Sequence, residues 1–303
     1  MFKDGDILCF LGDSITASGL WESEVYQILR KKYKIKCYNC GVSGASANQA
    51  INYLHSECLI YNPDYVFVMY GMNDFGLWLY SNECEKTEEI EKQKKERIRL
   101  HKESYECLIK SIMDFGATPV VCLPTPYDEI SPVKKEAVPY QQILEQGAQI
   151  QLEIANKYGL QVVNFKDNLK PLLGKRNIIS EDRVHPNEEG YHIMAQIFLK
   201  ETGQIDECDF DTPFEFEDWN KERYLFESTE IKAIRYVDLC VRYCDGAYNN
   251  TCKTNEELVE FIKEDYKNHP NKELFVPTAY MKYLDRGDKY NQIRGEVIKR
   301  TIY

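Results

Sequence analysis

Five short apolar runs, widely spaced along the chain, constrain the fold more than any other feature of the sequence. Each run is rich in Val, Ile, Tyr or Phe, and most are continuous rather than alternating with polar residues. They cover residues 7–11, 35–38, 65–70, 119–123 and 161–165. Strands that are buried on both faces of a parallel sheet have this pattern. The runs therefore predict the five strands of a parallel sheet.

Helical patterns fill the gaps between the runs. They lie near residues 20–33, 46–58, 86–115, 136–158 and 187–202. A chain in which strands and helices alternate folds as an α/β protein with right-handed crossovers. We therefore predict a three-layer α/β/α sandwich with a flavodoxin-like five-stranded parallel sheet over residues 1–203. Binding sites of such folds lie at the carboxyl ends of the strands.

The composition changes after Gly203. Residues 205–226 are acidic and aromatic without a clear period, which predicts an extended arm over a surface. Helical patterns follow near residues 229–244, 254–267 and 288–302. We therefore expect residues 204–303 to form an extended arm and a mainly helical C-terminal extension. This extension would pack on the sandwich or form a homo-oligomer with another copy of the chain.

Charge and cysteine usage narrow the class of protein. A formal net charge of −11 argues against nucleic-acid and anionic-membrane partners, because both favour a basic protein surface. No apolar run approaches the roughly 18 residues that span a bilayer. The N-terminal MFKDGDILCF lacks the apolar core of a signal peptide, and the 11 cysteines are odd in number and scattered. These features favour a cytoplasmic protein with reduced thiols.

Cys37 and Cys40 form a C-x-x-C pair, which is one half of many zinc sites. Both lie on a predicted strand, and no second pair at the spacing of a zinc finger follows. Buried structural cysteines explain this pattern better than a metal site. We expect neither a metal nor a cofactor.

Four polar motifs lie at predicted strand ends or directly before a helix. They are GDS (12–14), NCGVSG (39–44), YGMND (70–74) and EDRVHPNEEGYH (181–192). Because the carboxyl ends of parallel strands meet at one edge of a sheet, these motifs are expected to lie close together. Ser14 alone would be an ordinary helix N-cap, so its meaning depends on the other three motifs.

The four motifs together contain the residue types that ester hydrolysis needs. A serine hydroxyl such as that of Ser14 is a weak nucleophile and needs a base within hydrogen-bond reach. His185 can be that base, and Asp182, three residues earlier, can orient its imidazole. The backbone N–H groups of Ser14 and Gly44 and the side-chain amide of Asn73 are candidate donors for an oxyanion hole.

The four motifs also resemble the sequence blocks of the SGNH, or GDSL-type, hydrolases, in the family's order. GDSIT resembles the first block, with the nucleophile at Ser14, and NCGVSG resembles the second, with Gly44. GMND resembles the third, with Asn73, and DRVHPN resembles the last, with Asp182 and His185. The resemblance covers roughly residues 5–200. It implies a flavodoxin-like catalytic domain that hydrolyses esters or thioesters without a metal.

Other residues at the predicted edge have different roles. Asp13 is expected to anchor the turn that presents Ser14, and His192 is expected to be structural. Candidates for the wall of a substrate pocket are Asp74, Trp21, Trp78 and Tyr127. An α/β-hydrolase fold is excluded, because GVSGA lacks the final glycine of the G-x-S-x-G elbow.

These observations predict a carboxylic ester hydrolase that acts through an acyl-enzyme. The acidic, aromatic-rich chain favours removal of acetyl groups from a carbohydrate, since aromatic faces stack on sugar rings. Three alternatives stay open. A lysophospholipase or thioesterase would take longer acyl chains, and an acyltransferase would pass the acyl group to an acceptor other than water. A binding module with an inactive site would use the C-terminal extension as its interaction surface.

Overall fold

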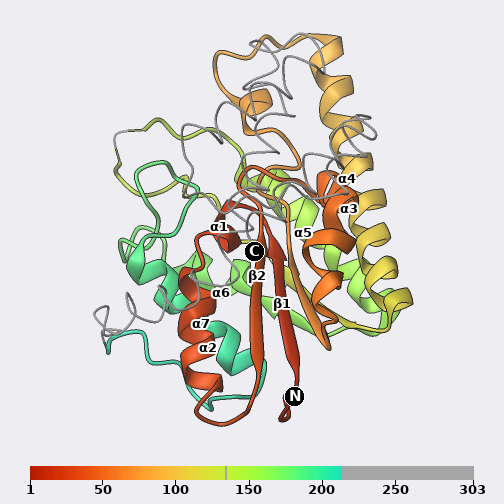
Figure 1. The fold of residues 1–303 in the computed structure, drawn as a ribbon. Coiled ribbons are helices and arrows are strands. Elements are labelled where there is room, and N and C mark those ends of the chain that lie inside the picture. The colour runs from red at the N-terminus through yellow and green to blue at the C-terminus, as the bar shows by residue number, and fades with distance from the viewer. Residues whose placement is uncertain (134, 213–303) are drawn as a thin grey trace, which may run out of the picture.

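The computed structural model describes residues 1–133 and 135–212. Five parallel strands form one sheet in the order β2-β1-β3-β4-β5, which is the predicted flavodoxin-like order (Figure 1). They are β1 (Ile7–Gly12), β2 (Lys36–Gly41), β3 (Tyr65–Met69), β4 (Thr118–Leu123) and β5 (Val162–Asn164). The five strands coincide with the five apolar runs, so the predicted sandwich is confirmed.

Helices cover both faces of the sheet (Figure 1). On one face lie α2 (Leu20–Leu29), α6 (Phe165–Leu169) and α7 (Glu188–Glu201). On the other lie α3 (Ala47–Glu57), α4 (Glu88–Phe115) and α5 (Gln141–Tyr158). Short helical turns complete the described chain: α1 (Ser14–Ala17), η1 (Leu59–Tyr61), η2 (Leu77–Tyr80) and η3 (Lys170–Leu172). None of the helices within the described residues is long and apolar enough to cross a membrane.

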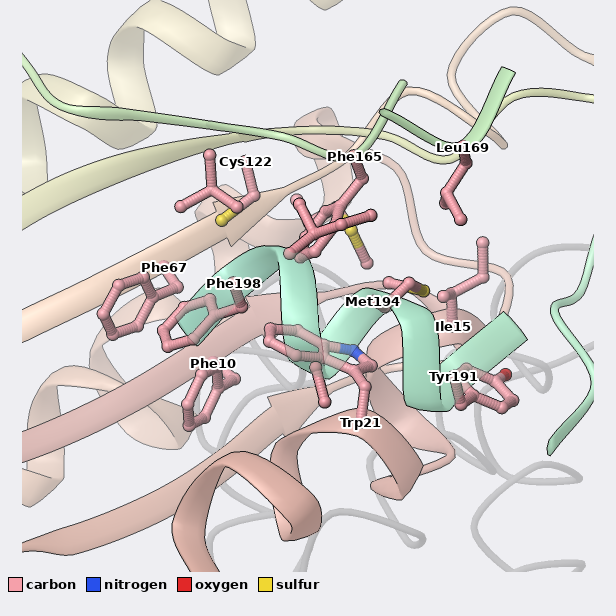
Figure 2. Packing of buried hydrophobic residues seen from close by; sticks show 14 of the residues in the cluster. Phe10, Ile15, Trp21, Phe67, Cys122, Phe165, Leu169, Tyr191, Met194 and Phe198 are labelled. Atoms are coloured by element: carbon pink, nitrogen blue, oxygen red, sulfur yellow. The ribbon is translucent and has the colours of Figure 1, made fainter. Parts of the chain in front are cut away.

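Each strand serves two apolar cores, because successive side chains point to opposite faces of a sheet. Cys9 and Leu11 of β1 pack toward α3, α4 and α5. Leu8 and Phe10 pack toward α2 and α7, where Figure 2 shows the aromatic side chains that fill this second core. Burial on both faces explains why the strands read as continuous apolar runs.

The register of the strands places the ends of β1, β2 and β3 at one edge. Gly12, the last residue of β1, is paired with Gly41 on one side and with Met69 on the other. The segments that follow these strands carry three of the four polar motifs. Figure 1 shows that α4 runs past this same edge of the sheet. The sheet therefore places these three motifs close together, beside the first turns of α4.

The start of α5 differs from the sequence-based expectation of residue 136. The helix begins at Gln141 because a distant side chain caps it. The carboxylate of Glu129 accepts hydrogen bonds of 2.8 Å from the backbone N–H groups of both Tyr140 and Gln141. Such a cap satisfies N–H groups that a helix start leaves without partners, and local sequence patterns do not reveal it.

The helices expected near residues 229–244, 254–267 and 288–302 lie outside the described residues, so the division into a domain of residues 1–203 and an extension stays a prediction. The first residues of the expected arm are described. Asp209 accepts a 3.0 Å hydrogen bond at its carbonyl from His192 on α7, and Asp211 pairs with Arg176 at 2.9 Å. Residues up to 212 thus contact the sandwich beside α7.

One glycine in the sheet controls the position of α1. A Cβ added at Gly41 would lie 2.3 Å from the backbone nitrogen of Ala17, and backbone atoms cannot move aside as a flexible side chain can. We expect Gly41→Ala to lower the free energy of unfolding by about 3 kcal/mol, measured by urea denaturation, because overpacking a close backbone contact forces the chain apart.

Gly116→Ala is the control for this substitution. Gly116 caps the C-terminus of α4 at φ +101°, and a Cβ there would meet no atom within 4 Å. Its substitution costs only the left-handed conformation, about 1 to 2 kcal/mol. Equal losses in the two variants would contradict the proposed close contact between β2 and α1.

Candidate active site

Three of the predicted residues form a continuous chain of hydrogen bonds at the carboxyl edge of the sheet. Ser14 begins α1 directly after β1, and Asp182 and His185 lie in the loop that leads to α7. The Ser14 Oγ lies 2.7 Å from His185 Nε2, and His185 Nδ1 lies 2.5 Å from Asp182 Oδ2. The fold thus joins residues that are 171 positions apart in the sequence.

The partners of the imidazole determine where its proton lies. A carboxylate only accepts hydrogen bonds, so His185 carries a proton on Nδ1 and donates it to Asp182. In the neutral imidazole, Nε2 is then free to accept the hydroxyl proton of Ser14. The two contacts leave His185 in the tautomer that a general base needs.

Asp182 is held in its charged form. Partial burial alone would raise its pKa, but hydrogen bonds from the backbone N–H and imidazole of His185 and from the N–H of Val184 outweigh burial and lower the pKa. Both N–H contacts measure 2.9 Å. An ionised Asp182 can stabilise an imidazolium at His185.

A buried arginine between these two residues was not identified from the sequence. Arg183 adopts φ +71°, a backbone conformation that residues other than glycine avoid. Its guanidinium donates to the backbone carbonyls of Lys135 at 2.6 Å and Asp128 at 2.8 Å. The backbone carbonyls of Asp128 and Lys135 therefore hold the strained turn that orients Asp182 and His185. No local sequence pattern distinguishes a buried loop arginine from one that is exposed to solvent.

Asp13 supports the turn at Ser14, as expected from the sequence. Its carboxylate accepts a 3.0 Å hydrogen bond from the backbone N–H of Ile15 and caps α1. Burial raises the pKa of Asp13 to about 7, against the lowering effect of that N–H. Asp13 is therefore a buried cap of the short helix that begins with Ser14.

The candidate oxyanion donors lie on the segments after β1, β2 and β3. Gly44 is exposed at φ +79°, and no group within the described residues accepts a hydrogen bond from its backbone N–H. The side-chain amide of Asn73 donates one hydrogen to the carbonyl of Ala45 at 3.2 Å, which ties it to the Gly44 segment. Ser14 is the first residue of α1, where backbone N–H groups have no partner within the helix.

A cavity of about 980 Å³ adjoins these residues. Gly44, Asn73 and Val184, the neighbour of His185, line it at the end near the triad. The first turns of α4 and the short helix η2 line the other side, with charged and polar side chains that belong mainly to α4: Glu89, Lys92, Gln93, Glu96 and Arg97. The cavity is therefore polar along one wall and reaches the candidate oxyanion donors Gly44 and Asn73 at the other.

Three of the four predicted pocket residues line this cavity. Trp78 on η2 is 54% exposed at its rim, while Tyr127 and Asp74 are buried in its wall. Asp74 uses its carboxylate for contacts inside the protein, so it is part of the framework of the cavity.

The expectation for Trp21 is corrected by the structure. Trp21 is 1% exposed and packs edge-on against Phe10 and Phe165, with ring centroids 5.1 and 5.3 Å apart (Figure 2). It follows Gly19, whose left-handed conformation begins α2, and the helix turns the indole toward the sheet. Trp21 therefore belongs to the core between the sheet and α7.

The cysteines lie apart from the triad. Cys37 and Cys40 point into the two different cores, so they cannot share one metal ion. In the described part of the chain, one cluster has metal-ligand spacing: the sulfur atoms of Cys9, Cys40 and Cys58 lie within 4.8 Å of one another. All three are fully buried in the core on the α3 side, and burial raises the pKa of the Cys9 and Cys40 thiols. The neutral thiols of Cys9 and Cys40 act as apolar packing. Burial alone would also raise the pKa of the Cys58 thiol, but hydrogen bonds with Cys40 and Cys9 outweigh burial and lower it to about 5.

Two comparisons of sequence agree with this geometry. Residues 8–198 match the family of GDSL-like lipases and acylhydrolases. An acetylxylan esterase from Geobacillus stearothermophilus is 26% identical over 224 residues, which cover 66% of this chain and 94% of that protein. The family match includes the strands, the four motifs and α7 almost to its end.

Solved structures show the same fold. A gut microbial diltiazem-metabolizing enzyme, BT4096, is 26% identical with a TM-score of 0.59, covering 67% of this chain but 48% of its own, so the match spans about half of that protein. Axe2, an acetylxylan esterase from Geobacillus stearothermophilus, is 21% identical with a TM-score of 0.55, covering 66% of this chain and 95% of its own. With the family match spanning most of residues 1–203, the resemblance of the four motifs is confirmed, and this chain belongs to the GDSL-like lipase/acylhydrolase family.

Proposed function

We propose that this protein is a serine-dependent carboxylic ester hydrolase that removes short acyl groups, chiefly acetyl, from a carbohydrate. The observation that carries the proposal is the hydrogen-bonded chain from Asp182 through His185 to Ser14, at 2.5 and 2.7 Å. A serine is activated when a base accepts its proton and a third group orients that base. Membership of an acylhydrolase family supports the same reaction.

The reaction takes two steps on the same residues. Ser14 Oγ attacks the ester carbonyl carbon while its proton passes to His185 Nε2, and His185 then gives that proton to the departing alcohol. Water next attacks the acyl-enzyme, His185 accepts a proton from the water, and the proton returns to Ser14 as the acid leaves. Asp182 stabilises the imidazolium in both steps through its contact with Nδ1.

The carbonyl oxygen becomes negatively charged in both tetrahedral intermediates. The backbone N–H groups of Ser14 and Gly44 and the amide of Asn73 are the donors that we assign to it. The free N–H of Gly44 and the second amide hydrogen of Asn73 support this assignment, because neither is used in the contacts described above. Each such donor contributes roughly a hundredfold to a thousandfold in rate.

The cavity favours a carbohydrate ester over a long acyl chain. Its volume of about 980 Å³ exceeds what an acetyl group needs, so the alcohol part of the substrate fills most of it. Lys92, Glu96 and Arg97 line it, and charged side chains suit a polyhydroxylated alcohol better than an alkyl chain. The exposed indole of Trp78 at the rim offers a flat face to a sugar ring. The related acetylxylan esterase supports an acetylated sugar.

Our proposals for the binding partners and the cellular location of the protein rest on the sequence alone. The acidic net charge and the scattered cysteines underlie our proposals of a cytoplasmic protein with no nucleic-acid or membrane partner. A homo-oligomer formed through residues 204–303 likewise stays a prediction. An ester substrate is the one partner that family membership implies.

A panel of esters tests the proposed function. Hydrolysis should be fastest for acetyl esters, slower for butyryl esters and close to background for octanoyl esters, because charged side chains of α4 line part of the cavity and suit a polar alcohol better than an alkyl chain. Acetylated xylooligosaccharides should release acetate, and added sugar acceptors should not divert the acetyl group. Product analysis by chromatography measures both outcomes.

The Ser14→Ala variant is the control for this panel. Loss of the nucleophile should lower kcat by a factor of about 10³ or more, with the thermal unfolding transition retained, because the hydroxyl is half-buried and its removal leaves little space. Full activity in this variant would contradict the assignment of Ser14. A preference for octanoyl esters would instead favour a lysophospholipase or thioesterase.

We expect Trp78 to contribute to the binding of sugar esters but not to the binding of small esters. Trp78→Ala should raise KM for an acetylated xylooligosaccharide about tenfold through loss of ring stacking, and should change KM for 4-nitrophenyl acetate less than twofold. Phe115→Ala, at the opposite end of α4 and also partly exposed, removes an aromatic ring outside the cavity and should change neither value. Equal effects of Trp78→Ala on both substrates would argue against a sugar-binding role.

A further inference from the structure

A second histidine–carboxylate pair lies directly behind the Asn73 loop. His101 on α4 and Asp74 at the end of the YGMND motif form a 2.7 Å contact between Nδ1 and Oδ1. Their side chains are 0% and 2% exposed, so the pair has no access to bulk water and does not react with a substrate. The proposed hydrolysis uses neither side chain as an acid, a base or a nucleophile.

The surrounding contacts fix the protonation state of His101. The side-chain nitrogen of Gln151 on α5 donates to the carbonyl of Tyr70 at 2.7 Å, which identifies that atom as the amide NH₂. The same nitrogen lies 3.2 Å from His101 Nε2, so Nε2 accepts. His101 is therefore neutral and carries its proton on Nδ1, where it donates to Asp74.

The carboxylate of Asp74 ties together two segments that carry oxyanion donors. Its Oδ1 accepts from the backbone N–H of Ala47, the first residue of α3, at 3.1 Å. Its Oδ2 accepts from the backbone N–H of Gly71 at 3.0 Å. The segment of Gly44 leads into α3, and Asn73 lies between Gly71 and Asp74. The carboxylate thus fixes the Gly44 segment relative to the Asn73 loop.

Helix α4 contacts Asp74 at two points, the backbone carbonyl and the side-chain carboxylate. Arg97, one turn before His101, donates from Nη1 to the backbone carbonyl of Asp74 at 3.2 Å. His101 meanwhile holds the carboxylate of the same residue. Residues four positions apart share one face of a helix, so both contacts come from a single rigid surface. This same helix also forms a wall of the cavity.

We infer that His101 is a positioning residue for the oxyanion hole. By donating to Asp74, it holds the carboxylate in the orientation that keeps the Asn73 amide and the Gly44 N–H directed at one carbonyl oxygen. The inference rests on the proposed function, because it assumes that these two groups stabilise an oxyanion. Donors in fixed positions stabilise the transition state without the cost of reorienting during the reaction.

The inference predicts a change in kcat rather than in KM. An oxyanion forms only in the transition state, so a displaced donor weakens turnover while the bound ground-state ester is little affected. His101→Leu keeps an apolar group of similar size but removes the donor. We expect its kcat for 4-nitrophenyl acetate to fall about tenfold to a hundredfold, with KM unchanged within twofold. Active sites are counted by titration with a fluorophosphonate, so that unfolded protein does not lower the measured kcat.

A conservative variant and a matched control distinguish positioning from general stability. The side-chain nitrogen of Asn can occupy the place of His Nδ1, so His101→Asn should recover most of the lost kcat. Tyr105→Phe removes a buried 3.0 Å hydrogen bond to Val68 from the same helix, one turn further on. It should lower the melting temperature but leave kcat per titrated site unchanged.

The outcomes separate this inference from the proposed function. If the wild-type protein hydrolyses acetyl esters and His101→Leu has an unchanged kcat, the positioning role is overturned and the proposed function is not. The same holds if the kcat of His101→Asn is no higher than that of His101→Leu. An equal loss of kcat in Tyr105→Phe also overturns it, because general loosening of α4 would then explain the effect. A wild-type protein that hydrolyses no acetyl ester overturns the proposed function and this inference with it.

Discussion

The register of β1 with its two neighbours determines where the motifs of this protein lie. Gly12 is paired with Gly41 and with Met69, so three strands end together and their following segments begin at one edge. Close backbone packing between Gly41 and α1 then sets the position of Ser14. The distant loop with His185 completes the site from the α7 side. Catalytic geometry is thus a consequence of sheet geometry together with one loop.

Much of this arrangement could be predicted from the sequence, because the features concerned are local. Buried parallel strands read as continuous apolar runs, and all five were located in this way. The contacts among Ser14, Asp182 and His185 join motifs whose residue types already matched one reaction. The strand order followed from the expected fold class. The short spacing between Asp182 and His185 lets both side chains share one local surface, which makes their direct contact predictable.

Long-range burial could not be predicted in the same way. From one sequence, charged residues in a helical pattern are expected to face the solvent. Glu22 on α2 is instead fully buried, and burial raises the pKa of its carboxyl well above the usual range. His101 lies in a highly charged segment, but its side chain is buried where α4 packs against Asp74. Trp21 follows a strand end, as a pocket residue would, and turns into the core instead. These outcomes depend on how helices pack, which periodicity does not specify.

The proposed function depends on Ser14 as the nucleophile that carries the acyl group. Its most direct test is peptide mass spectrometry after the protein has reacted with a fluorophosphonate, a reagent that bonds to an activated serine. We expect one added phosphonyl group on the peptide that contains Ser14, at a rate that falls when Asp182 is replaced by Asn, since the imidazole of His185 then loses its orienting carboxylate. A label on a different residue, or hydrolysis that continues at full rate in the labelled protein, would contradict it.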